Sequence, residues 1–302
     1  KTAERKQYEW MLAKNNIPNV KTEGEEQWIK YWSFGKMTPN RVCYRLFNNY
    51  LQTGGGKNIV SDVICSRIIE PILNPLQMRP YYGDKNMFDR ICPQGYFPKT
   101  YLRRINGFYY DGQYNRLLTK ADCISAIQSE NVETIVVKPT VGGISGNGVK
   151  VLKTGDMVNL EELEKEEGND FIVQECIKQH PVISKFNPTS INTIRIAVYR
   201  SVIDDSAHVL SAILRIGAEG SKVDNAHQGG RFVEITKDGK LGKRVYNQWG
   251  ESDEVFNHID FSEEHNVPNW YSLCEFAKSV CKYVPHHRLL ALDCVLKADG
   301  TP

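Results

Sequence analysis

The sequence lacks the features that mark several large classes of protein. No apolar run approaches the about 18–20 residues that span a bilayer, so we expect no integral membrane segment. Residues 1–16 alternate charged and apolar side chains without an apolar centre, which is unlike a secretory signal peptide. The net charge is only +2, from 38 Lys and Arg against 36 Asp and Glu. The strong positive field typical of nucleic-acid-binding proteins is therefore missing, and we expect no nucleic-acid partner.

The eight cysteines form no CxxC pair, and none shares zinc-like spacing with a histidine. Most of them lie inside apolar stretches; Cys274 and Cys281, for example, fall on one face of a predicted helix. We expect buried free thiols in a reducing cytoplasm, which excludes a disulfide framework. A catalytic cysteine is the alternative.

The 302 residues, 41% of them hydrophobic and 25% charged, have an ordinary globular composition. The length suits two domains or one subdivided domain. Apolar side chains recur at helical spacing through the first eighty residues, and Trp28, Tyr31 and Trp32 predict an aromatic core stripe.

After Pro98, strand and helix patterns alternate, which predicts an α+β or α/β architecture. Asn106-Gly107 predicts a tight hairpin turn between two of the strands. The predicted strands are 100–105, 108–111, 134–137, 149–153, 171–175, 193–199, 209–216 and 289–296. The predicted helices are 119–130, 160–167 and 269–284.

The most informative segment joins a strand, a lysine and a glycine-rich loop. Lys138 ends the strand, and Gly142, Gly143, Gly146 and Gly148 follow within ten residues. Bare backbone N–H groups in such a loop can surround phosphate oxygens, and the ammonium can bind the same oxygens. The loop is not a P-loop, because Val149 stands where the lysine belongs, and GxGxxG is absent.

Two arginines alternate with buried-type residues on predicted strands. Arg195 lies between two isoleucines, and Arg215 lies between Leu214 and Ile216. Both side chains therefore point away from the apolar face of their strand. They either pair with acidic side chains such as Glu234 or make bidentate contacts with phosphate.

Five ordered motifs resemble those of the ATP-grasp ligases, most closely the sugar-transfer-associated ATP-grasp proteins. They are Gly83–Asn86, Val137–Gly148, Phe171–Ile177, Asn192–Ile196 and Leu292–Pro302, within a resemblance that covers roughly residues 83–302. The resemblance implies an ATP-grasp fold, with two α+β subdomains clasping ATP and a helical N-terminal region. The corresponding divisions are residues 1–82, 83–178 and 179–302.

The resemblance also implies roles for individual residues. ATP binding is implied for Lys85, Lys138, Gly142, Gly143, Ser145, Gly146, Gly148, Gln174, Glu175, Cys176, Ile177, Gln179 and His180, of which the last two follow the adenine-binding hinge and approach the ribose. Catalytic roles are implied for Arg195, Arg215 and Asn225, and Mg²⁺ binding for Asp293.

Some of these residues have alternative interpretations. Lys85 is otherwise a solvated lysine, Glu175 a carboxylate with a core partner, and His180 a surface histidine. The loop that contains Asn225 is otherwise a surface hairpin. The family's second metal motif, Glu-x-Asn, is absent before Pro302, which leaves the metal site incomplete or indicates a truncated or disordered end.

The predicted activity is ATP-dependent ligation in the cytoplasm. An acyl phosphate forms first, and an amine or thiol then displaces phosphate to give an amide or thioester. The partners are small molecules, namely a carboxylate donor and an amine acceptor, in the modification of a cell-surface saccharide or its precursor. The alternatives are a phosphotransferase of the same fold and a non-catalytic nucleotide-binding protein.

Overall fold

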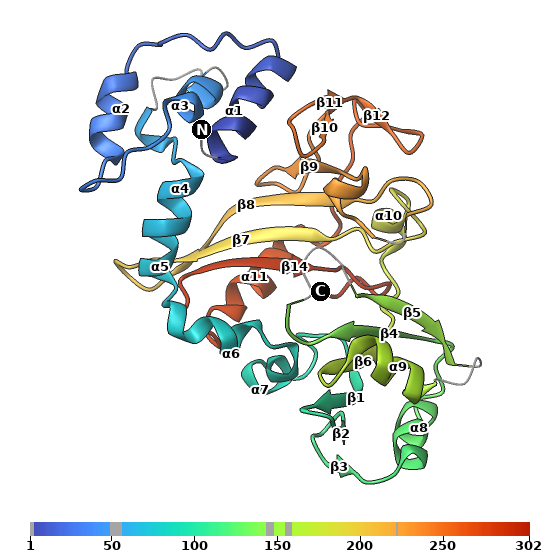
Figure 1. The fold of residues 1–302 in the computed structure, drawn as a ribbon. Helices are drawn as coiled ribbons and strands as arrows, with labels where there is room; N and C mark the ends of the chain where they lie inside the picture. Colours follow the sequence, from blue (N-terminus) through green and yellow to red (C-terminus); the bar gives the residue numbers. More distant parts are fainter. Residues whose placement is uncertain (1–2, 49–55, 143–147, 155–158, 222) are drawn as a thin grey trace.

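A computed structural model describes residues 3–48, 56–142, 148–154, 159–221 and 223–302. Figure 1 shows a helical N-terminal part and two further parts, each built on one of two sheets. The predicted α+β class is confirmed. Within the described ranges, none of the helices has the length and apolar character needed to cross a membrane.

Three helices form the N-terminal core: α1 (Ala3–Lys14), α2 (Glu25–Trp32) and α3 (Arg41–Asn48). Trp28 is buried as predicted, but the prediction for Tyr31 is wrong, because its side chain is 52% exposed. The buried stripe of α2 instead runs through Glu25, Trp28 and Ile29. The Glu25 carboxylate turns inward because it accepts hydrogen bonds from the guanidinium of Arg45, at 2.8 and 2.9 Å.

A chain of short helices leads from this part to the two sheets (Figure 1). The run from Asp62 to Leu73 contains α4 (Asp62–Ile64), a π-helical turn (Cys65–Ile69) and α5 (Glu70–Leu73). It is followed by α6 (Arg79–Gly83) and α7 (Phe88–Ile91). The segment between the last two helices contains Lys85.

The first sheet has the strand order β3-β2-β1-β6-β4-β5, and all neighbours are antiparallel. Its strands are β1 (Thr100–Ile105), β2 (Phe108–Asp111), β3 (Arg116–Leu117), β4 (Thr134–Pro139), β5 (Lys150–Lys153) and β6 (Phe171–Glu175). Asn106 and Gly107 have φ of 50° and 80°, as the predicted hairpin turn requires. Helices α8 (Lys120–Gln128) and α9 (Leu160–Glu167) cover one face with apolar side chains.

The second sheet has the order β11-β10-β9-β8-β7-β14 and is also antiparallel. Its strands are β7 (Ile194–Arg200), β8 (Ala207–Ile216), β9 (Arg231–Ile235), β10 (Val245–Tyr246), β11 (Ser252–Asp253) and β14 (Leu289–Cys294). Helix α11 (Trp270–Val280) packs against β7 and β8. A small hairpin, β12 (Val255–Phe256) and β13 (Ile259–Asp260), stands apart from this sheet.

The connection between the sheets runs through the end of β6 and the short helix α10 (Pro181–Ser184). There the backbone pairs with the segment that follows β14: the N–H of His180 donates to Leu296, and the N–H of Ala298 donates to Lys178, both at 2.8 Å. The first sheet occupies residues 100–175 and the second residues 194–294. The divisions at residues 82 and 178 stay predictions.

Candidate functional site

Lys85 and Lys138 are brought together although 53 positions separate them in the chain. Lys138 lies on β4, on the opposite face from the buried Ile135 and Val137. The strand leads to Thr140, whose carbonyl accepts the backbone N–H of Lys85 at 3.0 Å and its ammonium at 3.4 Å. The ammonium of Lys138 makes no hydrogen bond or ion pair with any residue that the structure describes.

The ammonium of Lys85 disfavours the charged form of Lys138. Burial, followed by the nearby charge of Lys85, lowers the pKa of Lys138 to about 8. Burial also lowers the pKa of Lys85. The carboxylate of Asp89 acts in the other direction on Lys138, but it is also ion-paired with the fully buried guanidinium of Arg103. Asp84 acts in the other direction on Lys85. Two sheltered cations, of which Lys138 has no ion pair among the described residues, suit a polyanionic ligand.

Buried polar atoms lie on the residues that adjoin this pair. Asn86 is 2% exposed, and neither its Oδ1 nor its Nδ2 has a partner among the described residues. Thr140 is 1% exposed, and its Oγ1 likewise lacks a partner there. Thr140, Asp89 and Arg103 were not predicted from the sequence. Thr140 could have been noticed, because it follows Lys138-Pro139 directly.

The glycine-rich loop begins and ends in left-handed backbone. Gly142 and Gly148 have φ of 77° and 78°. A Cβ on Gly148 would lie only 2.9 Å from Cδ of Pro139, so the returning chain needs glycine at this position. Three predicted loop residues, Gly143, Ser145 and Gly146, lie outside the described residues.

The predicted hinge lies at the end of β6, beside an open pocket of about 530 Å³. Glu175, Cys176 and Ile177 line this pocket, together with Asn131–Thr134 and Lys297–Asp299. The carboxylate of Glu175 accepts the backbone N–H of Lys99 at 3.0 Å, which fixes its direction. Gln174 is buried, and its amide donates to Thr100 Oγ1 at 3.0 Å, so this side chain joins β6 to β1.

Gln179 and His180 both make structural hydrogen bonds. The Gln179 carboxamide donates to the carbonyl of Asn192 at 2.7 Å and accepts from its backbone and side-chain N–H groups, both at 3.1 Å. His180 Nδ1 accepts the N–H of Val182 and so caps α10. Contact of these two residues with a ribose stays a prediction, and Gln179 would have to exchange existing hydrogen bonds to make it.

A cluster of alternating charges occupies the exposed face of the second sheet. Arg195 on β7 binds Asp293 on β14 through two hydrogen bonds, of 2.7 and 2.8 Å. Arg215 on β8 lies 3.6 Å from the same carboxylate and 3.1 Å from Asp224. Asp293, followed by Asp224, raises the pKa of Arg195. The sequence predicted that these arginines either pair with acidic side chains or bind phosphate. They pair with acidic side chains here, but the partners are aspartates and not Glu234.

Asn225 shapes the loop beside this cluster. Its side chain is buried, and Oδ1 accepts the N–H of His227 at 3.0 Å at the start of the turn Ala226–Gln228. The neighbouring Asp224 is the residue of this loop that binds Arg215, and it was not predicted as a site residue.

The described residues do not build a magnesium site by themselves. They contain no group of three or more His, Cys, Asp or Glu side chains that could hold a metal. Asp293, the predicted ligand, has both oxygens bound by Arg195. One carboxylate beside nucleotide phosphates suits Mg²⁺ only after the pair with Arg195 opens.

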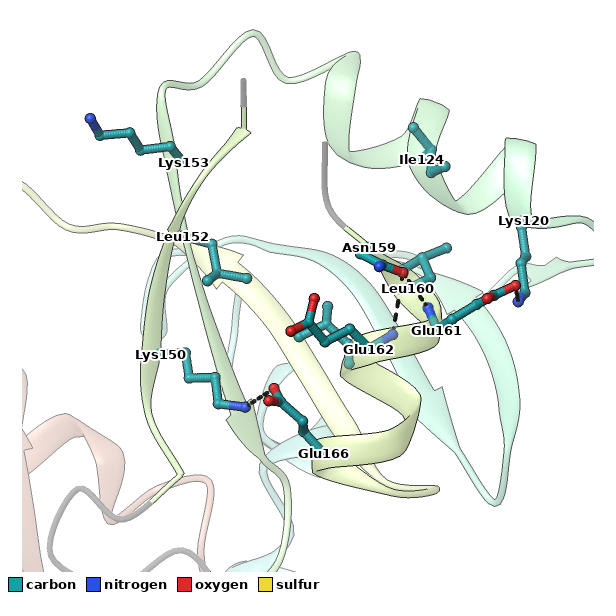
Figure 2. Close-up of a pocket in the computed structure, with 11 residues that line it drawn as sticks. Lys120, Ile124, Lys150, Leu152, Lys153, Asn159, Leu160, Glu161, Glu162 and Glu166 are labelled. Atoms are coloured by element: carbon teal, nitrogen blue, oxygen red, sulfur yellow. Dashed lines mark hydrogen bonds and ion pairs between the residues drawn. The ribbon is translucent and has the colours of Figure 1, made fainter. Parts of the chain in front are cut away.

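A second open pocket, of about 690 Å³, lies between β5, α8 and α9 (Figure 2). None of the predicted site residues lines it. Its charged side chains largely pair with one another, as in Lys120 with Glu161 at 2.9 Å and Lys150 with Glu166. The predicted site residues lie elsewhere, at the lysine pair, the hinge and the arginine cluster.

Comparison with known proteins gives a family match. The model of the sugar-transfer associated ATP-grasp family matches residues 66–302. No curated protein matches the sequence.

The solved structures that match the chain share little sequence with it. A D-cycloserine synthetase is 13% identical over 80% of this chain and 67% of its own, with a TM-score of 0.46. The D-alanine–D-alanine ligase from Bacillus anthracis is 12% identical over 100% and 81%, with a TM-score of 0.41. The ADP complex of an N5-carboxyaminoimidazole ribonucleotide synthetase is 13% identical over 74% and 44%, also with 0.41. The chain thus spans less than half of that last protein.

Proposed function

The chain belongs to the sugar-transfer associated ATP-grasp family, as the sequence motifs predicted, and on this premise we propose that it is an ATP-dependent ligase that joins a carboxylate to an amine. ATP is a substrate in this proposal. The acceptor or the donor is a saccharide or a saccharide precursor, which the association of the family with sugar transfer supports.

The lysine pair carries the proposal. The charge of Lys85, whose ammonium donates to Thr140, acts on Lys138, which has no described counter-ion in a sheltered place where unpaired charge is costly. ATP phosphates would supply the missing negative charge. The hinge pocket begins at Thr134, four residues before Lys138 on β4, which is about 13 Å at the usual strand rise. The base and ribose would occupy this interval.

The proposed reaction has two steps. An oxygen of the donor carboxylate attacks the γ-phosphorus of ATP, the bond to the β,γ-bridging oxygen breaks, and ADP leaves with the electron pair. The amine then attacks the carbonyl carbon of the acyl phosphate. The carbon–oxygen bond to phosphate breaks, the amine loses a proton, and an amide and inorganic phosphate result. A thiol in place of the amine would give a thioester.

The chain's own cations have distinct roles in this scheme. Lys85 and Lys138 hold the phosphates of ATP, and Arg195 and Arg215 stabilise the charge on the transferred phosphoryl group. Bidentate guanidinium contacts orient that group better than ammonium contacts do. When bound, Mg²⁺ would neutralise further phosphate charge, with Asp293 as its candidate ligand. The described residues do not complete that site.

We also propose a cytoplasmic location. All eight cysteines are free thiols, five of them buried, which supports a reducing compartment.

Product analysis tests the proposed reaction. The protein is incubated with ATP, magnesium and pairs of sugar acids, amino acids and amino sugars, with ¹⁸O in the donor carboxylate. A ligase transfers one ¹⁸O into inorganic phosphate for each amide formed. A phosphotransferase instead leaves the γ-phosphoryl group on a substrate and forms no amide. A protein that binds ATP but turns over no pair fits the non-catalytic alternative.

A further inference from the structure

Asp224 uses both carboxylate oxygens to join two neighbouring strands. Oδ1 lies 3.1 Å from Nη2 of Arg215, and Oδ2 accepts the backbone N–H of Thr193 at 3.1 Å. The carbonyl of Thr193 in turn accepts the backbone N–H of Arg215 at 2.8 Å. The carboxylate is therefore fixed by the backbone just before β7, the strand that carries Arg195.

The two ion pairs of the cluster differ in their exposure. The side chains of Arg215 and Asp224 are 15% and 14% exposed, whereas those of Arg195 and Asp293 are 44% and 47% exposed. An exposed pair contributes little stability and separates at small cost. A sheltered pair separates at a much larger cost, because each charge is then left without its partner.

The guanidinium of Arg215 is shared between the two carboxylates. Nη2 lies near Asp224, and Nη1 lies 3.6 Å from Asp293, which is longer than a hydrogen bond. Asp224 thus holds one end of the guanidinium, and the other end remains available toward the exposed side of the cluster.

We propose that Asp224 is a positioning residue that keeps Arg215 in place while the exposed Arg195–Asp293 pair opens to admit the terminal phosphate of ATP. This inference rests on the proposed function, because it assumes that the cluster meets a nucleotide triphosphate. Arg215 then contacts the terminal phosphate through Nη1, the end of its guanidinium that faces Asp293. Without Asp224, the guanidinium of Arg215 would turn to Asp293. It would then no longer be held toward the terminal phosphate.

Titration calorimetry with ADP and the non-hydrolysable ATP analogue AMP-PNP, in magnesium buffer, tests the inference. Asp224→Asn keeps an acceptor for Thr193 but removes the charge that holds Arg215. We expect affinity for AMP-PNP to fall about 10-fold, the loss typical of one charge-assisted hydrogen bond, and affinity for ADP to change less than about 2-fold. The matched control is Asp253→Asn, which removes the partner of Arg231, 3.2 Å away in the same sheet, and should alter neither affinity.

The outcomes separate the inference from the proposed function. If the unaltered protein binds neither nucleotide, the proposed function fails. If it binds both and Asp224→Asn binds both equally well, or loses both equally, the positioning role is wrong. If Asp224→Asn does not fold, Arg215→Lys replaces it, and a loss confined to AMP-PNP is again required. Where both variants fold, the double variant Asp224→Asn/Arg215→Lys should lose no more affinity for AMP-PNP than the single variant with the larger loss. Additive losses of affinity would contradict action of Asp224 through Arg215.

Discussion

Arg195 and Asp293 lie directly opposite each other on β7 and β14 and share two hydrogen bonds, of 2.7 and 2.8 Å. The arginine predicted to bind phosphate is therefore paired with the aspartate predicted to bind the metal. Each charge of the pair is compensated by the other at the exposed face of the sheet. Removal of one side chain should therefore change how the other binds its ligand.

Asp293→Asn should raise the affinity for AMP-PNP in the presence of a chelator by about 3-fold, because a carboxylate that repels phosphate is removed and Arg195 is released. In magnesium buffer the same variant should lose most of the gain that the metal gives to the unaltered protein. Titration calorimetry under both conditions measures this. A fall in the metal-free affinity would show that Asp293 does not hold Arg195 away from the nucleotide.

Lys138→Met should stabilise the protein without ligand, by about 1 kcal/mol, because a sheltered ammonium without a described partner is replaced by an apolar chain of similar length. Thermal unfolding without nucleotide is the measurement. Lys120→Met, which removes an exposed ion pair with Glu161, is the control and should leave the midpoint nearly unchanged. A lower midpoint in Lys138→Met would mean that the ammonium has a stabilising partner.

The pH dependence of stability has a definite sign. Burial lowers the pKa of Lys138 to about 8, whereas an unfolded lysine has a pKa of about 10.4. Between these values the unfolded state binds more protons, so the contribution of Lys138 to the free energy of unfolding increases as the pH rises. Urea unfolding at pH 7.5 and pH 10 (about the two ends of this window) should therefore show a smaller gain for Lys138→Met than for the unaltered protein. Equal gains would contradict the depressed pKa.

Glu175→Ala should weaken ATP binding and reduce the preference for ATP over GTP, because the carboxylate lines the hinge pocket where the 6-amino group of adenine would lie. Cys176→Ser should be nearly silent, since only the backbone of that residue is expected to contact the base. Competition binding with the two nucleotides measures both effects. If Cys176→Ser abolishes activity at normal ATP affinity, thiol chemistry replaces the hinge account.

Gly148→Ala should destabilise the protein by more than about 1 kcal/mol, because φ is 78° and the new Cβ would meet Pro139 at 2.9 Å. Gly83→Ala is the matched control, since nothing lies within 4 Å of a Cβ there and α6 ends at that residue. Equal unfolding midpoints for the two variants would contradict the close return of the loop onto Pro139.

Local signals in the sequence predicted much of the fold. The bounds of β1, β2, β6 and α9 agree with the structure, because they end at local signals such as the turn Asn106-Gly107 or, for α9, the cap residues Asn159 and Gly168. Short strands such as β10 and β11, of two residues each, leave no period to detect. Tyr31 was misplaced because the buried face of α2 includes Glu25, whose burial with its partner Arg45 an apolar pattern does not reveal.

The candidate site was predictable only where its residues belong to motifs. Lys85, Lys138 and the hinge were named from sequence, and the structure brings the two lysines near each other, with Lys85 bound to Thr140. The partners of the arginines were not predicted, because β14 lies beside β7 although Asp293 is 98 positions from Arg195 in the chain. Strand order over such separations is a property of the whole fold, so neither this pair nor the role of Asp224 could be read locally.

Titration of AMP-PNP into the unaltered protein and into the double variant Lys85→Met/Lys138→Met tests the central claim most directly. The account predicts one nucleotide per chain for the unaltered protein. For the double variant it predicts an affinity lower by at least about 100-fold, as expected when two charge-assisted contacts are lost, with an unfolding midpoint no lower than before. No binding by the unaltered protein, or equal binding by both proteins, would contradict the assignment of the lysine pair to ATP phosphates.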